Sequence, residues 1–391
     1  MTKKSVIILG STGSVGQQAL EVVDSLHDQF EVYALSCHQN TDLLIQQAKK
    51  FLPDCVVVSK ETDYEKVKTA LWEDDVKVYF GAESLNQIVS TKEVDIVLNA
   101  LIGFAGLEPT LSAIEANKRV ALANKESLVV AGPLIAEKLK KSTARLVPID
   151  SEHSAIFQCL LGEFDNPIEK IILTASGGPF RGKLPEELEM VQPQQAISHP
   201  TWKMGAKISV DSATMINKGF EMIEAQWLFG LKPAQIELLI HPESLVHSMV
   251  QFEDGSVKAQ MGATDMKGPI QYALCYPERI KSSIERIDFS KIGQLNFSKV
   301  ETSHYPNLEL AIQVLNQGGI LPCALNASNE IAVQAFLIGK ITFNQIYEVN
   351  QKVFLTMQNK AIVDLNTLKE VDINAREKAK EFIGVLQTDL R

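Results

Sequence analysis

The feature that most limits the possible folds is a regular alternation along the first 150 residues. Seven short runs rich in Val, Ile and Leu have the character of strands: SVIILG, EVYALS, CVVVS, VKVYFG, VDIVLNAL, RVALA and ARLVPID. Amphipathic stretches such as SVGQQALEVVDSL and TDLLIQQAKKF lie between them and have the character of helices. Strands that are apolar on both faces and separated by helices are typical of a parallel, doubly wound sheet. We therefore predict an α/β domain over residues 1–150.

The texture changes after residue 150, so further parts are expected. Residues 151–288 combine longer helical patterns with the strand IEKIILTAS and a hairpin signal, SMVQFEDGSVKAQM, with Asp254-Gly255 at its turn. This region is predicted to be an α+β domain. Residues 289–307 lack periodicity and are expected to be an extended connector. Residues 308–391 have helical periodicity, which predicts a small C-terminal helical domain.

Length, charge and cysteine usage exclude several classes of protein. A chain of 391 residues is too long for one ordinary core. A net charge of −10 argues against nucleic acid as a partner, because a duplex-binding surface needs clustered Lys and Arg. The five cysteines contain no CxxC pattern, which favours buried thiols in a reducing compartment. The first apolar run is short and leads into a glycine turn, so it is expected to be a strand, and the protein cytoplasmic without a membrane segment.

A glycine-rich turn follows the first strand and opens a helix. Its sequence is GSTGSVG, from Gly10 to Gly16. Residues without a Cβ let the backbone approach a pyrophosphate, whose charge then meets free N–H groups at the helix start. The groups expected to contribute are those of Thr12, Gly13, Ser14 and Val15. The alternative is a tight strand-to-helix turn without a ligand.

The end of the second strand indicates which dinucleotide would bind. An NAD-binding domain usually has Asp or Glu there, to accept from the ribose 2′-hydroxyl. Here the residues are Ser36, Cys37, His38, Gln39 and Asn40, without an acid and also without Arg or Lys. A neutral or donor-rich pocket suits a 2′-phosphate, so NADP is favoured over NAD. The alternative for His38 is an ordinary exposed histidine.

Two carboxylates stand where the last strand of the first domain gives way to a helix, in the stretch LVPIDSEHSAIF. Asp150 and Glu152, two positions apart, would share one side of an extended segment and could hold a cation together. The alternative is helix capping by Asp150 or Ser151, with acids favoured at the positive helix end.

Two further stretches carry polar groups unsuited to a plain core. The segment ALANKES places Asn124, Lys125 and Glu126 at the carboxyl end of a strand, where open α/β sheets bind ligands. In KISVDSATMINKGFEMIEAQW, Asn217 and Glu221 share one helix face beside Lys218, with Ser212 nearby. Such donors could hold a phosphate and the acid a metal, whereas the alternative is an amphipathic helix with a solvated face. All ligands would be oxygens, which favours Mg²⁺ or Mn²⁺.

A loop with a hinge-like start is predicted over residues 177–206. Ser176 ends a strand and is followed by Gly177-Gly178. The loop continues through QQAISHPTWKMGAK, which contains His199, Trp202 and Met204. An irregular loop with an exposed indole is expected to close over a substrate as a lid. The alternative is that Trp202 packs into the core of the second domain.

Taken together, these motifs resemble one enzyme family. GSTGSVG, LANKESLV, PIDSEHSAIFQ, SGGPFR, HPTWKMGAKISVDSATMINKG followed by Glu221, IHPESLVHSMV and ALNASNE occur in the order and spacing of 1-deoxy-D-xylulose 5-phosphate reductoisomerases. The resemblance runs from end to end. It implies a Rossmann-like domain, an α+β catalytic and dimerisation domain with a mobile loop, and a C-terminal helical domain. It also implies a cytosolic homodimer that uses NADPH and a divalent metal, Mg²⁺ or Mn²⁺ with Co²⁺ as an alternative, in the non-mevalonate isoprenoid pathway.

The resemblance assigns roles residue by residue. The metal ligands would be Asp150, Glu152 and Glu221, with the NKGxE pattern favouring Glu221 over Glu224. Lys125 and Ser151 would contact substrate hydroxyls. The substrate phosphate would be bound by Ser176, Ser212, Asn217 and Lys218, with His199 nearby and Trp202 and Met204 covering it. The nucleotide would be lined by Thr12, Gly13, Ser14, Val15, Asn40, Asn124, Glu126 and Gly205, with His38 and Gln39 where the family commonly has a small and a basic residue.

Two other functions remain compatible with the motifs. One is an ordinary NADP-linked dehydrogenase of a phosphorylated polar metabolite, in which the acids only cap helices. The other is a nucleotide-sensing protein without turnover.

Overall fold

The computed structural model describes residues 3–163, 165–198, 202, 204–362 and 364–388. Backbone contacts divide the chain into two compact units. The first unit comprises Met1–Asn124, Ile135–Ser154 and Asp265–Ile284, and the second comprises Lys125–Leu134, Ala155–Thr264 and Glu285–Arg391. The four-part division expected from the sequence stays a prediction.

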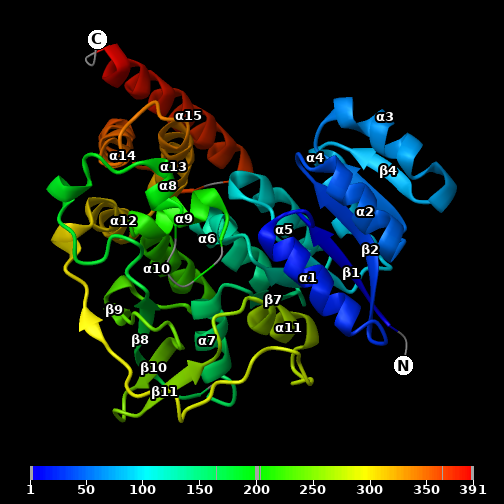
Figure 1. Cartoon of the computed structure of the whole chain (residues 1–391), viewed down its shortest axis with the longest axis horizontal. Helices are drawn as coiled ribbons and strands as arrows, with labels where there is room; N and C mark the ends of the chain where they lie inside the picture. Colours follow the sequence, from blue (N-terminus) through cyan, green and yellow to red (C-terminus); the bar gives the residue numbers. More distant parts are fainter. Residues whose placement is uncertain (1–2, 164, 199–201, 203, 363, 389–391) are drawn as a thin grey trace. The chain divides into compact units, whose positions relative to one another are not determined.

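The first unit is built on a seven-stranded parallel sheet (Figure 1). Its order is β4-β3-β2-β1-β5-β6-β7, which confirms the doubly wound fold class. Val6 to Leu9 of β1 are all buried, as expected for a strand covered on both faces. The strands are β1 (Lys4–Leu9), β2 (Phe30–Cys37), β3 (Cys55–Val58), β4 (Lys77–Phe80), β5 (Ile96–Asn99), β6 (Arg119–Leu122) and β7 (Arg145–Pro148).

Helices connect these strands and alternate with them along the chain. They are α1 (Ser14–Ser25), α2 (Thr41–Phe51), α3 (Glu61–Ala70), α4 (Ala82–Val89) and α5 (Leu107–Glu115), with the 3-10 turns η1 (Trp72–Asp74) and η2 (Gly103–Gly106). A later helix, α11 (Lys267–Cys275), packs against α1, and Lys267 pairs with Glu21 at 3.0 Å. Helices α6 (Lys125–Lys140) and α7 (Ser151–Cys159) have residues in both units. Helix α6 is kinked at Ala131, two residues before Pro133.

The second unit has a mixed five-stranded sheet of order β11-β10-β8-β9-β12. The predicted hairpin is confirmed: β10 and β11 pair antiparallel around the turn at Gly255, whose φ is 84°. Within the connector predicted over residues 289–307, a two-residue strand, β12, pairs with β9 at Leu239 and Ile240, and a 3-10 turn follows it. The elements are β8 (Ile168–Ala175), β9 (Ile236–Ile240), β10 (Val246–Phe252), β11 (Val257–Met261), β12 (Ser298–Lys299) and η5 (Thr302–His304).

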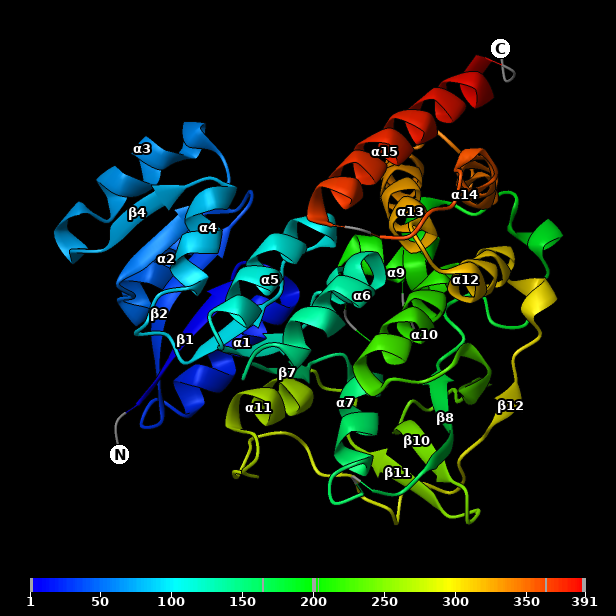
Figure 2. The ribbon, with the colours of Figure 1, turned by 180° about the vertical axis from the view of Figure 1, so that it is seen from behind.

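Helices supply the rest of the second unit, including the predicted C-terminal ones. Figure 2 shows α13 beside α14 and α15, which it contacts. Helix α10 packs closely on α12 because Gly219 leaves room: a Cβ there would lie 2.3 Å from that of Ala311. The helices are η3 (Pro185–Leu188), α8 (Pro193–Ala196), α9 (Ala206–Ala213), α10 (Ile216–Phe229), η4 (Pro233–Gln235), α12 (Pro306–Gln317), α13 (Leu321–Leu337), α14 (Gln345–Thr356) and α15 (Leu365–Thr388). Within the described ranges, none of the helices combines the length and apolar character needed to cross a bilayer.

Candidate active site

The turn between β1 and α1 lies at the switch point of the first sheet, where β1 separates β2 from β5. Gly10 has φ 77°, and a Cβ there would lie 2.7 Å from the carbonyl oxygen of Ala100. A Cβ on Gly16 would lie 2.3 Å from the Gly10 oxygen. Both glycines are therefore required by the packing of the turn. Ser11 anchors it by donating from Oγ to Gln47 Oε1 at 2.7 Å.

The helix start that follows is suited to an anion. Among the residues described, no side chain caps the first turn of α1 and no acid lies in it. The N–H groups of Ser14 and Val15 lie in this turn, where a helix provides no acceptor. Of the expected donors, Gly13 differs: its N–H already donates to the Gly10 carbonyl at 3.0 Å. The structure thus fits a dinucleotide phosphate at Thr12, Ser14 and Val15.

The other residues predicted to line the nucleotide differ in their contacts and exposure. Asn40 caps α2, with its Oδ1 accepting from the N–H of Leu43 at 3.1 Å. His38 and Gln39 are exposed. Asn124 is buried, and its amide donates to the carbonyls of Leu101 and Gly103 at 2.9 and 3.0 Å. Asn124 therefore orders the loop after β5, whatever else it contacts.

Of the two carboxylates after β7, Asp150 directly precedes α7 and Glu152 lies in its first turn. The expectation that Asp150 and Glu152 share one side of an extended segment is wrong, because α7 already begins at Ser151. They are nevertheless close, with a carboxylate oxygen of each within 4.8 Å of the other. The Ser151 hydroxyl donates to Glu152 Oε2 at 2.5 Å, and His153 Nδ1 lies 3.7 Å from Asp150 Oδ2. Two such carboxylates repel each other, so the pair favours a cation.

The second unit contains a buried cluster of two ammonium groups, one amide and one carboxylate. Lys125 Nζ donates to Asn217 Oδ1 at 2.8 Å and lies 3.4 Å from Glu221 Oε1. Lys218 Nζ lies 2.6 Å from Glu221 Oε2, and the Asn217 amide donates to the same carboxylate. Lys125, Lys218 and Glu221 are each at most 7% exposed, so the alternative of a solvated helix face is wrong here. Its two buried ammonium groups could bind an anionic group of a substrate.

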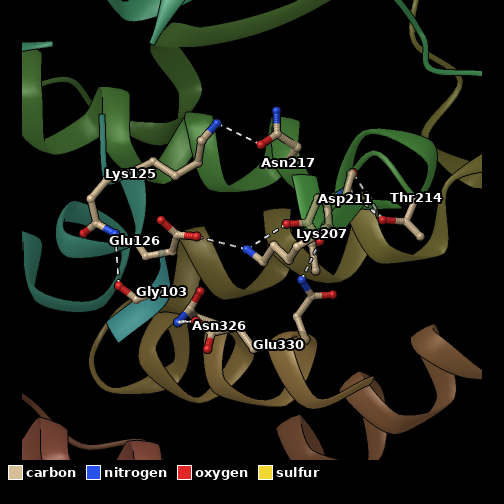
Figure 3. A network of polar contacts seen from close by, with 12 residues as sticks. Gly103, Lys125, Glu126, Lys207, Asp211, Thr214, Asn217, Asn326 and Glu330 are labelled. Carbon is tan, nitrogen blue, oxygen red and sulfur yellow. Dashed lines mark hydrogen bonds and ion pairs between the residues drawn. The ribbon is translucent and has the colours of Figure 1, made fainter. Parts of the chain in front are cut away.

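Local backbone geometry brings these side chains together. Helix α10 begins after Met215, which has φ 60°, an uncommon conformation for a non-glycine residue. The middle of α6 lies against the last turn of α10, since a Cβ on Gly132 would lie 2.1 Å from the indole of Trp227. The first turns of the same two helices carry Lys125 and Asn217, which are hydrogen-bonded to each other (Figure 3).

The predicted phosphate-binding serines lie on neighbouring segments. The Ser176 hydroxyl accepts from the N–H of Gly178 at 3.2 Å. A Cβ on Gly178 would lie 2.7 Å from the carbonyl oxygen of Ser212, so glycine permits this turn to approach α9. Of the loop residues, Trp202 has its ring centroid 6.1 Å from that of His247, and Met204 directly precedes Gly205, the N-cap of α9. His199 lies outside the described residues.

Glu126, predicted to line the nucleotide, is buried and forms an ion pair within the second unit. Its carboxylate lies 3.0 Å from Lys207 Nζ, which lies 2.8 Å from Asp211 Oδ2 (Figure 3). Burial alone would raise the pKa of Glu126, but the Lys207 ammonium holds it below its usual value. Sequence reasoning missed both Lys207 and Asp211, although their i, i+4 spacing on a helix was a usable signal.

The fold and these clusters define a class of protein. A dinucleotide turn at a switch point, a close carboxylate pair and a buried cationic cluster characterise a dinucleotide-dependent, metal-assisted enzyme that acts on an anionic substrate.

Comparisons with known proteins identify the family. Residues 6–132 match the family model "1-deoxy-D-xylulose 5-phosphate reductoisomerase", residues 146–229 its C-terminal domain, and residues 261–378 the "DXP reductoisomerase C-terminal domain". The reductoisomerases of Bacteroides fragilis and Phocaeicola vulgatus are both 52% identical to this chain; the matches cover 97% and 98% of it, and 98% and 100% of the relatives. The chain belongs to the 1-deoxy-D-xylulose 5-phosphate reductoisomerase family, which confirms the resemblance drawn from its motifs.

Solved structures agree with this assignment. The reductoisomerase of Zymomonas mobilis in complex with NADPH is 39% identical, with a TM-score of 0.90 over 98% of this chain and 99% of that one. A reductoisomerase in complex with NADPH, fosmidomycin and magnesium is 38% identical, with a TM-score of 0.93 and the same coverage.

Proposed function

We propose that this chain converts 1-deoxy-D-xylulose 5-phosphate to 2-C-methyl-D-erythritol 4-phosphate, a step of the non-mevalonate isoprenoid pathway. The reaction is a rearrangement of the carbon skeleton followed by reduction, and it depends on NADPH and a divalent metal. The observation that carries the proposal is the buried cluster of Lys125, Asn217, Lys218 and Glu221, in a chain of this family. The relatives bound to NADPH and magnesium support both cofactors.

The nucleotide is assigned to the turn after β1. Backbone N–H groups of Thr12, Ser14 and Val15 would hold its phosphates at the start of α1. The exposed residues that follow β2, the parallel neighbour of β1, would bound the adenosine ribose: His38, Gln39 and Asn40. Asn124, Glu126 and Gly205 remain further candidates for lining it. When bound, NADPH supplies the hydride for the reduction.

We assign one divalent ion to Asp150, Glu152 and Glu221. The donor set consists of carboxylate oxygens, which suits Mg²⁺ or Mn²⁺. The closeness of Asp150 and Glu152 supports the assignment, because a cation would relieve their repulsion. When bound, the ion would polarise the substrate carbonyl and stabilise negative charge on its oxygens.

The remaining polar residues are assigned to orient the substrate. Lys125 and Ser151 would position its hydroxyls. The phosphate would be bound by Asn217 and Lys218, in the first turn of α10, together with Ser176 and Ser212. Because the phosphate is remote from the bonds that change, its binding energy can order the loop over residues 177–206 and exclude water. His199, Trp202 and Met204 belong to that loop.

The assembly and location follow the family resemblance. We propose a homodimer that acts in the cytoplasm.

The assay is oxidation of NADPH with 1-deoxy-D-xylulose 5-phosphate and Mg²⁺, together with identification of the product. Metal-dependent oxidation that yields the branched tetrol phosphate is expected. Oxidation insensitive to EDTA would favour an ordinary NADP-linked dehydrogenase. NADPH binding without turnover would favour a nucleotide sensor.

A further inference from the structure

Lys207 joins two segments of the second unit that carry substrate residues. It stands in the first turn of α9, directly after the loop over residues 177–206. Its ammonium lies between the carboxylates of Glu126, in the first turn of α6, and Asp211, one turn further along α9 (Figure 3). The same ammonium lies 5.8 Å from the ring centroid of Phe220 on α10. Three helices therefore meet at one cation.

The position of Lys207 is unfavourable for α9 alone. A cation near a helix N-terminus opposes the helix dipole, and acids are preferred there. Burial alone would lower the pKa of Lys207, but Asp211 and Glu126 raise it above its usual value, so the ammonium stays charged. A residue that breaks a local rule and is held by two nearly buried acids is a candidate for a role in function.

The C-terminal helices support this arrangement through buried amides. The Asn329 amide on α13 donates to Asp211 Oδ1 at 2.8 Å. Asn350 on α14 donates to Asn329 Oδ1 at 3.2 Å and to Asn307 Oδ1 on α12 at 3.0 Å. All three asparagines are at most 5% exposed. Moving a buried amide would leave its polar groups unpaired, which is costly. The hydrogen bonds among these three asparagines therefore fix the orientation of Asp211.

A second set of polar contacts extends from α13 to α15. Glu330 on α13 accepts from Arg376 Nη2 at 2.6 Å and from the Asn326 amide at 2.9 Å (Figure 3 labels Glu330 and Asn326). Arg376 Nε also donates to Asp372 at 2.7 Å. Burial raises the pKa of Glu330 against the opposing effects of Arg376 and Lys207. The charge environment of Lys207 thus includes Glu330 on α13 and, through Glu330, Arg376 on α15.

We infer that Lys207 is a positioning residue: by joining Glu126 to Asp211 it fixes the spacing between Lys125 on α6 and Ser212 on α9, with the C-terminal helices as its support. Glu126 is the neighbour of Lys125, and Asp211 is the neighbour of Ser212. The inference rests on the proposed function for its effect on turnover. It also gives the C-terminal helices a part in the reaction, although they supply none of the predicted site residues.

The test compares Lys207→Met with Lys207→Arg. The methionine variant is expected to lose about tenfold to a hundredfold in kcat, because small misplacements of substrate-positioning groups have effects of this size. Its KM for NADPH is expected to stay within about twofold of wild type, since no backbone N–H of the β1–α1 turn is touched. Arginine retains the charge and is expected to recover most of the loss. The matched control is Lys170→Met, which removes a more exposed pair with Glu237 in the same unit and should leave kcat unchanged.

Coupling to Glu126 separates positioning from a direct nucleotide role. If Lys207 acts through Glu126, then Glu126→Gln and the double variant with Lys207→Met should have kcat values close to that of Lys207→Met alone. A raised KM for NADPH in Glu126→Gln, with losses that multiply in the double variant, would overturn the inference. A kcat of Lys207→Met within twofold of wild type would overturn it as well.

Hydrogen exchange keeps the inference distinguishable from the proposed function. If the wild-type chain shows no reductoisomerase activity, the proposed function fails. Peptides covering residues 206–213 and 125–134 should still exchange faster in Lys207→Met than in Lys207→Arg. If Lys207→Met does not fold, the same comparison is made with Asp211→Asn against wild type. Equal exchange in either comparison would overturn the inference.

Discussion

The ammonium of Lys125 donates a 2.8 Å hydrogen bond to the side-chain carbonyl of Asn217, 92 positions further along the chain. Both residues were candidates from separate motifs, one at the end of a strand and the other on a helix face. Their contact joins the starts of α6 and α10 within one buried cluster around Glu221. The proposed catalysis requires that cluster to be rigid before substrate arrives.

Replacing Lys125 by Met should therefore reduce turnover strongly. We expect kcat to fall by about 10²- to 10³-fold, the size of effect seen when one preorganised donor is removed from an active site. Affinity for NADPH, measured by fluorescence titration, should stay within about twofold. Lys138→Met is the matched control, since Lys138 belongs to the same helix and pairs with Glu115 at a more exposed position. A Lys125→Met enzyme with full turnover would remove this residue from the site.

Coenzyme preference is predicted to depend on the residues after β2. No acid stands there, so NADPH should be preferred to NADH. Gln39→Asp adds the carboxylate that NAD-binding domains use, and it should repel a 2′-phosphate. We expect kcat/KM for NADPH to fall and that for NADH to rise, which steady-state rates with each coenzyme will measure. Unchanged rates with both would place the 2′-position of the ribose away from Gln39.

The fold of the first unit followed from the sequence because its signals are local. Each of the seven apolar runs became a strand, since parallel strands buried on both faces have few alternatives. The loop carbonyls held by Asn124 could not be foreseen, because they depend on how the chain returns after β5. The carboxylate pair at Asp150 was expected in an extended segment, but the helix begins earlier, and only the helix geometry shows how the two acids approach.

The site in the second unit was only partly predictable. The helix spacing of Asn217 and Glu221 was readable, whereas the burial of both lysines beside Glu221 depends on tertiary packing. Lys207 and Asp211 were missed because their partners, Glu126 and Asn329, lie far away in sequence. The short strand β12 was missed because two residues carry no periodicity.

Two helical glycines in different surroundings are expected to respond in opposite ways to replacement by Ala. Gly219→Ala puts a methyl group 2.3 Å from that of Ala311 and should destabilise the protein by about 1–3 kcal/mol, as overpacking does. Gly384 lies in α15 with open space around it, so Gly384→Ala should stabilise by about 0.5–1 kcal/mol. Thermal unfolding of both variants provides the check. A Gly219→Ala protein as stable as wild type would mean that the two helices separate easily.

The Glu126–Lys207 pair predicts a defined dependence of stability on pH. The folded state lowers the pKa of Glu126, so its contribution is present above the unfolded pKa and is lost as pH falls through the folded one. Glu126→Gln lacks this contribution at every pH. The difference in Tm between wild type and variant should be largest near neutral pH. It should disappear as the pH falls below about 4, near the ordinary pKa of glutamate. A difference that stays constant or widens in acid would contradict the pairing.

Metal binding tests the proposed function most directly, because the proposed mechanism requires Asp150, Glu152 and Glu221 to share one ion. Titration with Mn²⁺, followed by the electron paramagnetic resonance of the free ion, gives stoichiometry and affinity without turnover. We expect one ion per chain, bound at least about tenfold more weakly in Asp150→Asn, Glu152→Gln and Glu221→Gln, since even residues behind the ligands have effects of this size. Glu224→Gln, one helical turn further, should bind as wild type does. Unchanged Mn²⁺ affinity in Glu221→Gln, or a loss confined to Glu224→Gln, would contradict the shared site.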